Sequence, residues 1–234
     1  MKTLIFGIHA ISAIPFLVQK NSPLRGTADA NIYPGKCPKI QGMPGFDVAK
    51  YMNRWWNIGN SPFIYESEGA KCGYADYHLK TDKKNRQYVD VANYDVKMNQ
   101  DTYSGMPGKG YPNESDPAAL SVQFRGFPSD DDNYWVLDTD YEYVYVWGCN
   151  NFCQTRYYFW GWLKVESCNH APLFWLLNTQ QSIPQDEIEK QLTLVSEILA
   201  DQLPVGYDWQ RLVDGWTPQN QKDCPVPEPE FYES

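Results

Sequence analysis

The sequence of 234 residues contains six cysteines, the side chains with the most obvious chemical reactivity. A free thiolate could act as a nucleophile or bind zinc, whereas paired cysteines form disulfides. A zinc site is disfavoured because the chain has no C-x-x-C pair and only three histidines. Cys149-x-x-x-Cys153 also has no second pair of closely spaced ligands to complete a four-ligand site. Behind a secretory leader, six cysteines predict three disulfides, although their spacing selects none of the fifteen pairings. They are Cys37, Cys72, Cys149, Cys153, Cys168 and Cys224.

The first 30 residues have the pattern of a signal peptide. Lys2 precedes an apolar stretch from Leu4 to Val18, and Ala28-Asp29-Ala30 has the small residues of a cleavage site. This stretch is shorter than the roughly 20 residues that span a bilayer. We therefore expect cleavage and a secreted, extracellular protein, and the alternative is an uncleaved membrane anchor.

The chain is acidic, with a formal net charge of −9. Loss of residues 1–30 would remove three cations and one carboxylate, and would bring the charge to −11. Such a surface repels a polyanion, and the sequence has no Lys/Arg cluster, so nucleic acid is not an expected partner.

The rest of the chain alternates strand-like runs with turn signals about every ten residues, which predicts an up-and-down antiparallel barrel. In one run, Ala75 and Tyr77 share a side, and in the next run Val89, Val91 and Asn93 do. The predicted strands cover residues 55–60, 73–80, 86–96, a short part of 101–119, 120–127, 134–138 and 142–149.

One helix is predicted over residues 184–202, where Ile188, Leu192, Val195 and Leu199 form an apolar stripe after Pro184. A single amphipathic helix late in an all-β chain is expected to pack against the outside of the barrel. Residues 31–234 are predicted to form one domain, with the barrel over about 54–178 and a tail over 203–234.

Several short motifs resemble those of the lipocalins in order and spacing. They are Gly35-Lys36-Cys37-Pro38, Phe46-Asp47-Val48, Lys50-Tyr51, Arg54-Trp55, Tyr134-Trp135, Thr139-Asp140-Tyr141 and Cys224-Pro225. The resemblance covers about residues 35–225. It implies an all-β fold, an eight-stranded up-and-down antiparallel barrel with one C-terminal α-helix packed outside, and a barrel-closing role for Trp55.

The chain departs from the lipocalin pattern at two places. The usual glycine two residues before the capping Trp is Asn53, which asks the backbone turn to tolerate a side chain. The usual Arg after the last strand is missing, because Asn178 follows Leu176-Leu177. Arg54 and Arg156 are the candidates to cover Trp55 in its place.

The resemblance also implies two disulfide pairings, Cys37 with Cys149 and Cys72 with Cys224. Cys153 and Cys168 then remain as a third pair, closing an aromatic insertion, Gln154 to Ser167, that is not part of the family pattern. Such a bond would stabilise the insertion by roughly 3 kcal/mol in the chain-entropy model.

An eight-stranded barrel is just wide enough to hold side chains or one small ligand. The resemblance implies a small hydrophobic ligand such as a lipid, sterol, retinoid, carotenoid or bilin. No cofactor is expected to be required, and a carotenoid or bilin chromophore would be bound as cargo. Rings are expected to stack on the ligand, and polar tips to orient its carbonyl or hydroxyl. The predicted ligand-binding residues are Tyr77, Val91, Asn93, Tyr134, Val136, Tyr145 and Trp175.

Two other function classes stay open. Some lipocalins are enzymes that use a thiol or acidic residues. Asp76 and Asp138 are the carboxylates that could act as such acidic residues here. Carboxylates on strands, however, more often face solvent. The other alternative is a secreted structural or defence protein whose barrel is filled with its own side chains.

The aromatic insertion has several open interpretations. Tyr157 to Trp162 could form a lid, a tip that contacts a membrane or receptor, or a contact between copies of the chain, because exposed apolar patches mark interfaces. It could equally pack as extra core. Asn113-Glu114-Ser115 is the only N-x-S/T sequon and predicts glycosylation of Asn113.

Overall fold

The computed structural model describes residues 32–62, 70–96, 103–124, 132–158 and 163–224. The predicted signal peptide, the end of the tail and residues 159–162 of the aromatic insertion lie outside these ranges. Within them, none of the helices has the length and apolar character needed to cross a bilayer.

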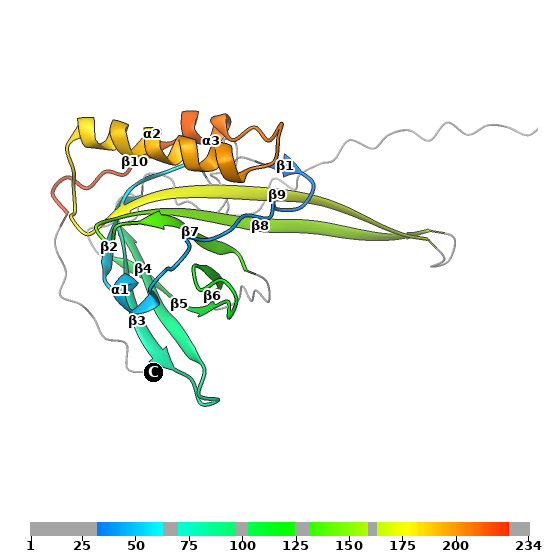
Figure 1. Ribbon diagram of the computed structural model, residues 1–234, viewed down its shortest axis with the longest axis horizontal. Helices are drawn as coiled ribbons and strands as arrows, with labels where there is room; N and C mark the ends of the chain where they lie inside the picture. Colours follow the sequence, from blue (N-terminus) through cyan, green and yellow to red (C-terminus); the bar gives the residue numbers. More distant parts are fainter. Residues whose placement is uncertain (1–31, 63–69, 97–102, 125–131, 159–162, 225–234) are drawn as a thin grey trace, which may run out of the picture.

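Eight antiparallel strands close into a barrel (Figure 1), so the predicted fold class is confirmed. The strands neighbour one another in chain order, and the last one pairs with the first, with Trp56 opposite Asn178. They are β2 (Arg54–Asn60), β3 (Lys71–Thr81), β4 (Gln87–Val96), β5 (Ser104–Pro112), β6 (Ala119–Phe124), β7 (Tyr134–Thr139), β8 (Tyr143–Tyr158) and β9 (Leu163–Asn178). Two short strands add to this wall: β1 (Tyr33–Pro34) pairs with β9, and β10 (Thr217–Pro218) pairs with β2.

The outer face of β8 and β9 is covered by helix α2 (Gln185–Gln202), which lies over the two strands in Figure 1. Ile188, Val195 and Leu199 are buried there in one apolar cluster with Trp147 and Phe174 of the strands. The short helix α3 (Gln210–Asp214), which the sequence did not predict, contributes Leu212 to the same cluster.

The closed end of the barrel begins at helix α1 (Val48–Tyr51). The Asp47 side chain accepts hydrogen bonds from the backbone nitrogens of Ala49 and Lys50, which caps this helix. Trp55 is completely buried, and its indole nitrogen donates to the Tyr51 carbonyl oxygen at 2.9 Å. The helix and the first strand are thereby fixed to each other.

The turn Thr139-Asp140-Tyr141 joins the closed end from the opposite wall. Tyr141 adopts a positive φ of 68°, and its hydroxyl accepts a hydrogen bond from the Asp47 backbone nitrogen at 2.9 Å. The ring of Tyr141 stacks against Phe46, with 6.4 Å between ring centroids. The two motifs, which lie far apart in the sequence, therefore meet to seal one end of the barrel.

Neither arginine replaces the missing family residue over Trp55, so that expectation was wrong. The Arg54 guanidinium forms two contacts with Asp76, at 2.7 and 2.8 Å, and lies over the Tyr74 ring on the outer face. Arg156 is exposed on the distal part of β8. The ring that covers Trp55 is that of Tyr51, at a centroid distance of 5.2 Å.

The replacement of the family glycine by Asn53 causes no backbone strain. The described non-glycine residues with positive φ are Cys72, Asn85, Tyr141 and Asp223, and Asn53 is not among them. Its side-chain oxygen accepts a hydrogen bond from the Arg54 backbone nitrogen at 2.8 Å, at the start of β2.

All three predicted disulfides are present, and none of the six cysteines is free. Cys37 to Cys149 ties the N-terminal segment to β8, and Cys153 to Cys168 joins directly opposite residues of β8 and β9. Cys72 to Cys224 ties the C-terminal tail to β3.

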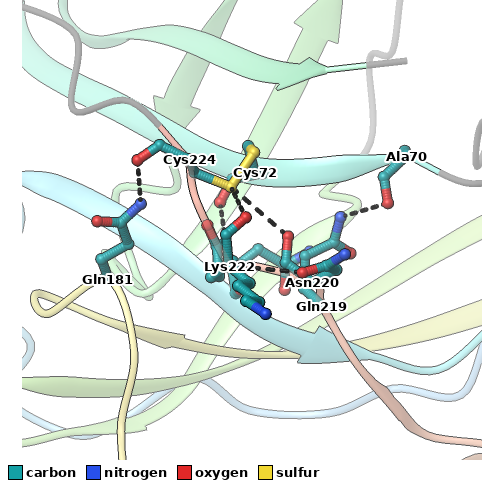
Figure 2. The surroundings of a disulfide bond; sticks show 10 residues. Ala70, Cys72, Gln181, Gln219, Asn220, Lys222 and Cys224 are labelled. Carbon is teal, nitrogen blue, oxygen red and sulfur yellow. Dashed lines mark hydrogen bonds between the residues drawn. A yellow bond between two sulfur atoms is a disulfide. The ribbon is translucent and has the colours of Figure 1, made fainter. Parts of the chain in front are cut away.

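The C-terminal tail covers a gap between β2 and β3. The two strands pair only over Arg54 to Trp56, after which β2 offers its free edge at Gly59 and Asn60 to β10. Figure 2 shows the disulfide that holds this segment, with the Gln219 side-chain nitrogen donating to the Ala70 carbonyl oxygen at 2.9 Å. The tail is thus a part of the barrel wall.

The aromatic insertion is an extension of β8 and β9 beyond the barrel. Their pairing continues to Tyr158 opposite Leu163, whereas pairing of β8 with β7 ends at Gly148 and pairing of β9 with β1 ends at Asn169. The described residues 150–158 and 163–168 therefore form a two-stranded ribbon, here called the arm, which projects away from the barrel in Figure 1. Its described side chains are mostly exposed, so the core-packing interpretation was wrong for them.

Candidate functional site

The inner face of the barrel is lined mainly by apolar side chains contributed by successive strands. Alternation along each strand places one residue in two inside, and the inner cluster is separate from the outer clusters beneath α2 and on the β2 to β4 wall. Its buried wall residues include Val89, Val91, Leu120, Val122, Val136, Val144, Val146 and Leu177. This lining offers dispersion contacts along most of the barrel.

Three tyrosine hydroxyls interrupt the apolar lining at one point. Tyr51 comes from α1, Tyr77 from β3 and Tyr134 from β7. The Tyr134 hydroxyl oxygen lies 2.7 Å from that of Tyr51 and 3.3 Å from that of Tyr77, so it is the centre of the group. Tyr51 and Tyr77 are buried, whereas Tyr134 is only partly buried.

Burial keeps these three hydroxyls protonated. Desolvation raises the pKa of Tyr77 to about 12, and it raises the pKa of Tyr51 and of Tyr134 well above the ordinary value of a tyrosine. The group therefore presents neutral O–H donors at physiological pH.

The hydroxyl protons of this group can be shared in more than one way. Tyr134 contacts both other hydroxyls, and Tyr51 and Tyr77 also interact with each other, so each hydroxyl can donate and accept within the group. If Tyr51 and Tyr77 both donate to Tyr134, the Tyr134 oxygen accepts twice and its own proton is free to turn toward a ligand. Because a donor that itself accepts hydrogen bonds is polarised, Tyr134 can donate strongly to an oxygen inside the barrel.

Two further predicted residues lie on the inner face and are partly exposed. Asn93 on β4 pairs with Ala75 of the inner cluster, and Trp175 on β9 packs against that cluster 6.2 Å from the Tyr134 ring. A Cβ atom at Gly148 would lie 2.9 Å from the Trp175 ring. The absence of a Cβ atom at Gly148 therefore leaves room for the edge of the Trp175 ring.

The prediction that Tyr145 faces the ligand was wrong about its direction. On β8, Val144 and Val146 belong to the inner cluster, so Tyr145 between them points outward. There it donates a hydrogen bond to the Gln191 side chain of α2. Tyr145 holds the helix to the barrel wall.

The remaining predicted residues are placed as follows. Tyr77, Val91 and Val136 are buried members of the inner cluster. Tyr51 was missed, although the Lys50-Tyr51 motif before the first strand could have indicated it. Asn113 follows β5, and its side-chain nitrogen donates to Asp132 at 2.8 Å. Glycosylation at this residue stays a prediction.

The residues considered for catalysis lie elsewhere. Asp76 is buried on the outer face in its ion pair with Arg54, and Asp138 is exposed. Disulfide bonding of all six cysteines removes a thiol nucleophile. Glu166 lies near Cys153 and Cys168, but their sulfur atoms bond each other and Glu166 pairs with Lys36 at 3.3 Å.

A closed eight-stranded barrel with an apolar lining, a Trp at its sealed end and a helix on its outer wall defines the class of proteins that enclose a small ligand. The lipocalin-like domain family matches residues 46–160. Apolipoprotein D of Mus musculus is 30% identical over 198 residues, which cover 83% of this chain and 87% of that protein. Apolipoprotein D of Bos taurus is 32% identical over 157 residues, covering 66% and 71%. The chain belongs to the lipocalin family, whose members bind small hydrophobic ligands.

Solved structures show the same fold. Apocrustacyanin C1 has a TM-score of 0.54 at 17% sequence identity, over 83% of this chain and 93% of that one. Insecticyanin from the tobacco hornworm Manduca sexta has a TM-score of 0.51 at 19% identity, over 82% and 89%. Identities this low support the fold alone.

Proposed function

We propose that this lipocalin is a secreted carrier that holds a small hydrophobic molecule bearing one acceptor oxygen inside its barrel. The apolar part of the ligand lies against the valine and leucine wall and the Trp175 ring. A carbonyl, ether or hydroxyl oxygen accepts the proton of Tyr134, and Asn93 offers a second polar contact. The candidates by chemistry are sterol ketones, retinoids, fatty acids and oxygenated carotenoids.

The convergence of three hydroxyls on the apolar inner face, with the partly exposed Tyr134 in contact with both others, is the observation that carries this proposal. A hydrogen bond to a ligand oxygen at this point contributes about 0.5 to 1.5 kcal/mol. A ligand oxygen at this point can accept the Tyr134 proton while Tyr51 and Tyr77 donate to the Tyr134 oxygen.

Secretion is part of the proposal and has separate support. The N-terminal residues have the pattern of a cleavable leader, and three disulfides suit an oxidising compartment. N-terminal sequencing of the protein from culture medium tests it, and retention of Met1 would contradict it.

The first experiment compares two probes that differ only in the oxygen. Quenching of tryptophan fluorescence is titrated with a steroid ketone and with the same skeleton lacking the ketone. We expect saturable binding of both, with the ketone preferred about five- to tenfold, the value of roughly one hydrogen bond. Tyr134→Phe should abolish the preference while it leaves binding of the hydrocarbon skeleton unchanged.

Tyr145→Phe is the matched control, since it removes a buried hydroxyl from the outer face of the same barrel. It should leave both affinities unchanged. Absence of saturable binding for these steroids and for retinoids, fatty acids and carotenoids would contradict the carrier function. Binding without a ketone preference would contradict only the role of Tyr134.

A further inference from the structure

The arm has no packing role in the barrel. None of its described residues belongs to the buried apolar clusters, and no further described strand pairs with its edges. The N-terminal segment contacts the arm at its base, where the Gly35 nitrogen donates to the Cys168 carbonyl oxygen at 2.8 Å and the Cys37 nitrogen donates to the Asn151 side chain at 2.7 Å. An isolated two-stranded ribbon is marginal in water, and Cys153 to Cys168 staples this one across its middle. The sequence thus keeps an extended element in solution that the core does not support.

The arm exposes apolar side chains on both of its faces. Phe152 and Val165 lie on one face and are 38% and 41% exposed. Tyr157 lies on the other face and is 66% exposed. A ribbon that packs on a flat protein surface needs only one apolar face, whereas a ribbon that enters an apolar medium benefits from two.

The arm is cationic on an acidic protein. The sequence from residue 143 to residue 165 contains no Asp or Glu, although the chain has 29 acidic residues. Arg156 and Lys164 are exposed near the far end of the arm, and no carboxylate among the described residues pairs with either. The one acidic residue of the arm, Glu166, is neutralised by Lys36.

We propose that the arm docks the protein on phospholipid bilayers that contain anionic headgroups. Arg156 and Lys164 contact the phosphates, and Tyr157 enters the interfacial region, where tyrosine and tryptophan side chains are favoured. This function is independent of what the barrel holds.

The length of the arm reduces the electrostatic repulsion between the acidic barrel and an anionic membrane. Nine paired residues of β8 extend roughly 30 Å at about 3.4 Å per residue. The Debye length in physiological salt is about 8 Å, so an arm that meets the membrane end-on keeps the acidic barrel several screening lengths away. Pairing of two arms from different copies would instead bring four like charges together, which disfavours a second copy as the occupant.

Flotation with vesicles tests the proposal on the full secreted chain. Vesicles of phosphatidylcholine with 30% phosphatidylserine should carry the protein to the top of a gradient at 100 mM salt, and vesicles of phosphatidylcholine alone should carry much less. The double substitution Arg156→Glu with Lys164→Glu should lower the partition coefficient at least about thirtyfold, from about fivefold per cation. Tyr157→Ser should lower it as well at unchanged charge.

The matched control reverses two charges at the other end of the barrel. Lys83 and Lys84 are exposed in the turn between β3 and β4, and Lys83→Glu with Lys84→Glu makes the same change in net charge. It should leave flotation unchanged. Failure of the parent protein to float, or an equal loss in the control, would overturn the proposal. A dimer by light scattering that the Arg156 and Lys164 substitutions dissolve, without flotation, would assign the arm to a second copy instead.

Discussion

His170 lies buried on the outer face of β9, beside the stacked rings of Tyr33 and Tyr207. Its Nδ1 lies 3.0 Å from the Gly35 carbonyl oxygen, which can only accept, so Nδ1 carries the proton. Its Nε2 lies 3.0 Å from the Tyr207 hydroxyl and accepts from it in the neutral form. The histidine therefore links the N-terminal segment to the chain between α2 and α3.

Acidification should weaken this link. Burial lowers the pKa of His170 below its ordinary value, so in the folded state the ring stays neutral while the unfolded chain takes up a proton. The free energy of unfolding should fall as the pH drops below about 6.5, by no more than about 1.4 kcal/mol per pH unit for one proton. Urea unfolding between pH 7.5 and 5 measures this.

His170→Gln provides the comparison for that slope. It should be less stable than the parent protein at pH 7.5, and the difference should narrow toward pH 5. The pKa values of Asp82 and Glu187 are also lowered, by hydrogen bonds, so their contribution is lost only at more acid pH. A constant difference between the two proteins from pH 7.5 to 5 would contradict the assigned role of His170.

Tyr134 and Tyr145 show that the register of a strand decides whether a tyrosine faces the inside or the outside of the barrel. Both are tyrosines on strands, and both were predicted to face the ligand. The β8 strand is apolar on its two sides, because valines line the barrel and Tyr145 and Trp147 pack beneath α2. When a helix covers the outer wall, hydrophobicity no longer distinguishes the two faces, and only the register does. The inner position of Asn93 was correct because Asp90, between Val89 and Val91, makes the opposite face of this strand more polar.

At the scale of elements, the C-terminal tail acts as a replacement strand. It pairs with β2 where β3 has separated, and the Gln221 side-chain nitrogen donates to the carbonyl oxygens of Asn57 and Gly73, one on each strand. Trp216 lies directly over Gly59, where a Cβ atom would come within 2.1 Å of its ring. The tail thereby bridges the seam between the two strands.

Removal of the Cys72 to Cys224 disulfide should release this bridge. Cys72→Ser with Cys224→Ser should cost about 2 to 5 kcal/mol of unfolding free energy, since the bond closes a loop with a sequence separation of 152 residues. Urea denaturation under non-reducing conditions gives the value. Cys153→Ser with Cys168→Ser is the comparison, because it opens a loop with a sequence separation of only 15 residues outside the core, and it should cost less, no more than roughly 3 kcal/mol.

The arm marks the limit of prediction at this scale. Strand alternation and turn residues located most of the barrel strands, and the 3.6-residue stripe located α2. The sequence predicted β8 to end near Cys149, because aromatic residues such as Tyr157 and Tyr158 suit strands, loops and interfaces equally. Pairing over 16 residues with β9 is a tertiary property that local patterns do not encode.

For the whole molecule, the barrel and the arm should be separable. Replacing residues 155–166 by Asn-Gly joins Gln154 to Ser167, which already face each other, and it keeps all three disulfides. The only described ion pair lost is the exposed one between Lys36 and Glu166, which contributes little. The melting temperature should change by only a few degrees, and ligand affinity by less than about twofold, whereas vesicle flotation should disappear.

Loss of ligand binding in that shortened protein would show that the arm also shapes the site. Such a result would contradict the separation of the two functions and would leave the disulfide pattern intact. Differential scanning calorimetry and the steroid titration, carried out on the same preparation, distinguish the two outcomes.

The pairing of β2 with β9 has a consequence for how the chain reaches this state. The first barrel strand finds its second neighbour only after Asn178 has left the ribosome, more than a hundred residues later. Contacts of such sequence separation slow folding toward the millisecond to second range. Until closure, the edges of β2 and β9 are open to other chains, so crowding during synthesis, rather than instability of the finished barrel, should set the yield of native protein.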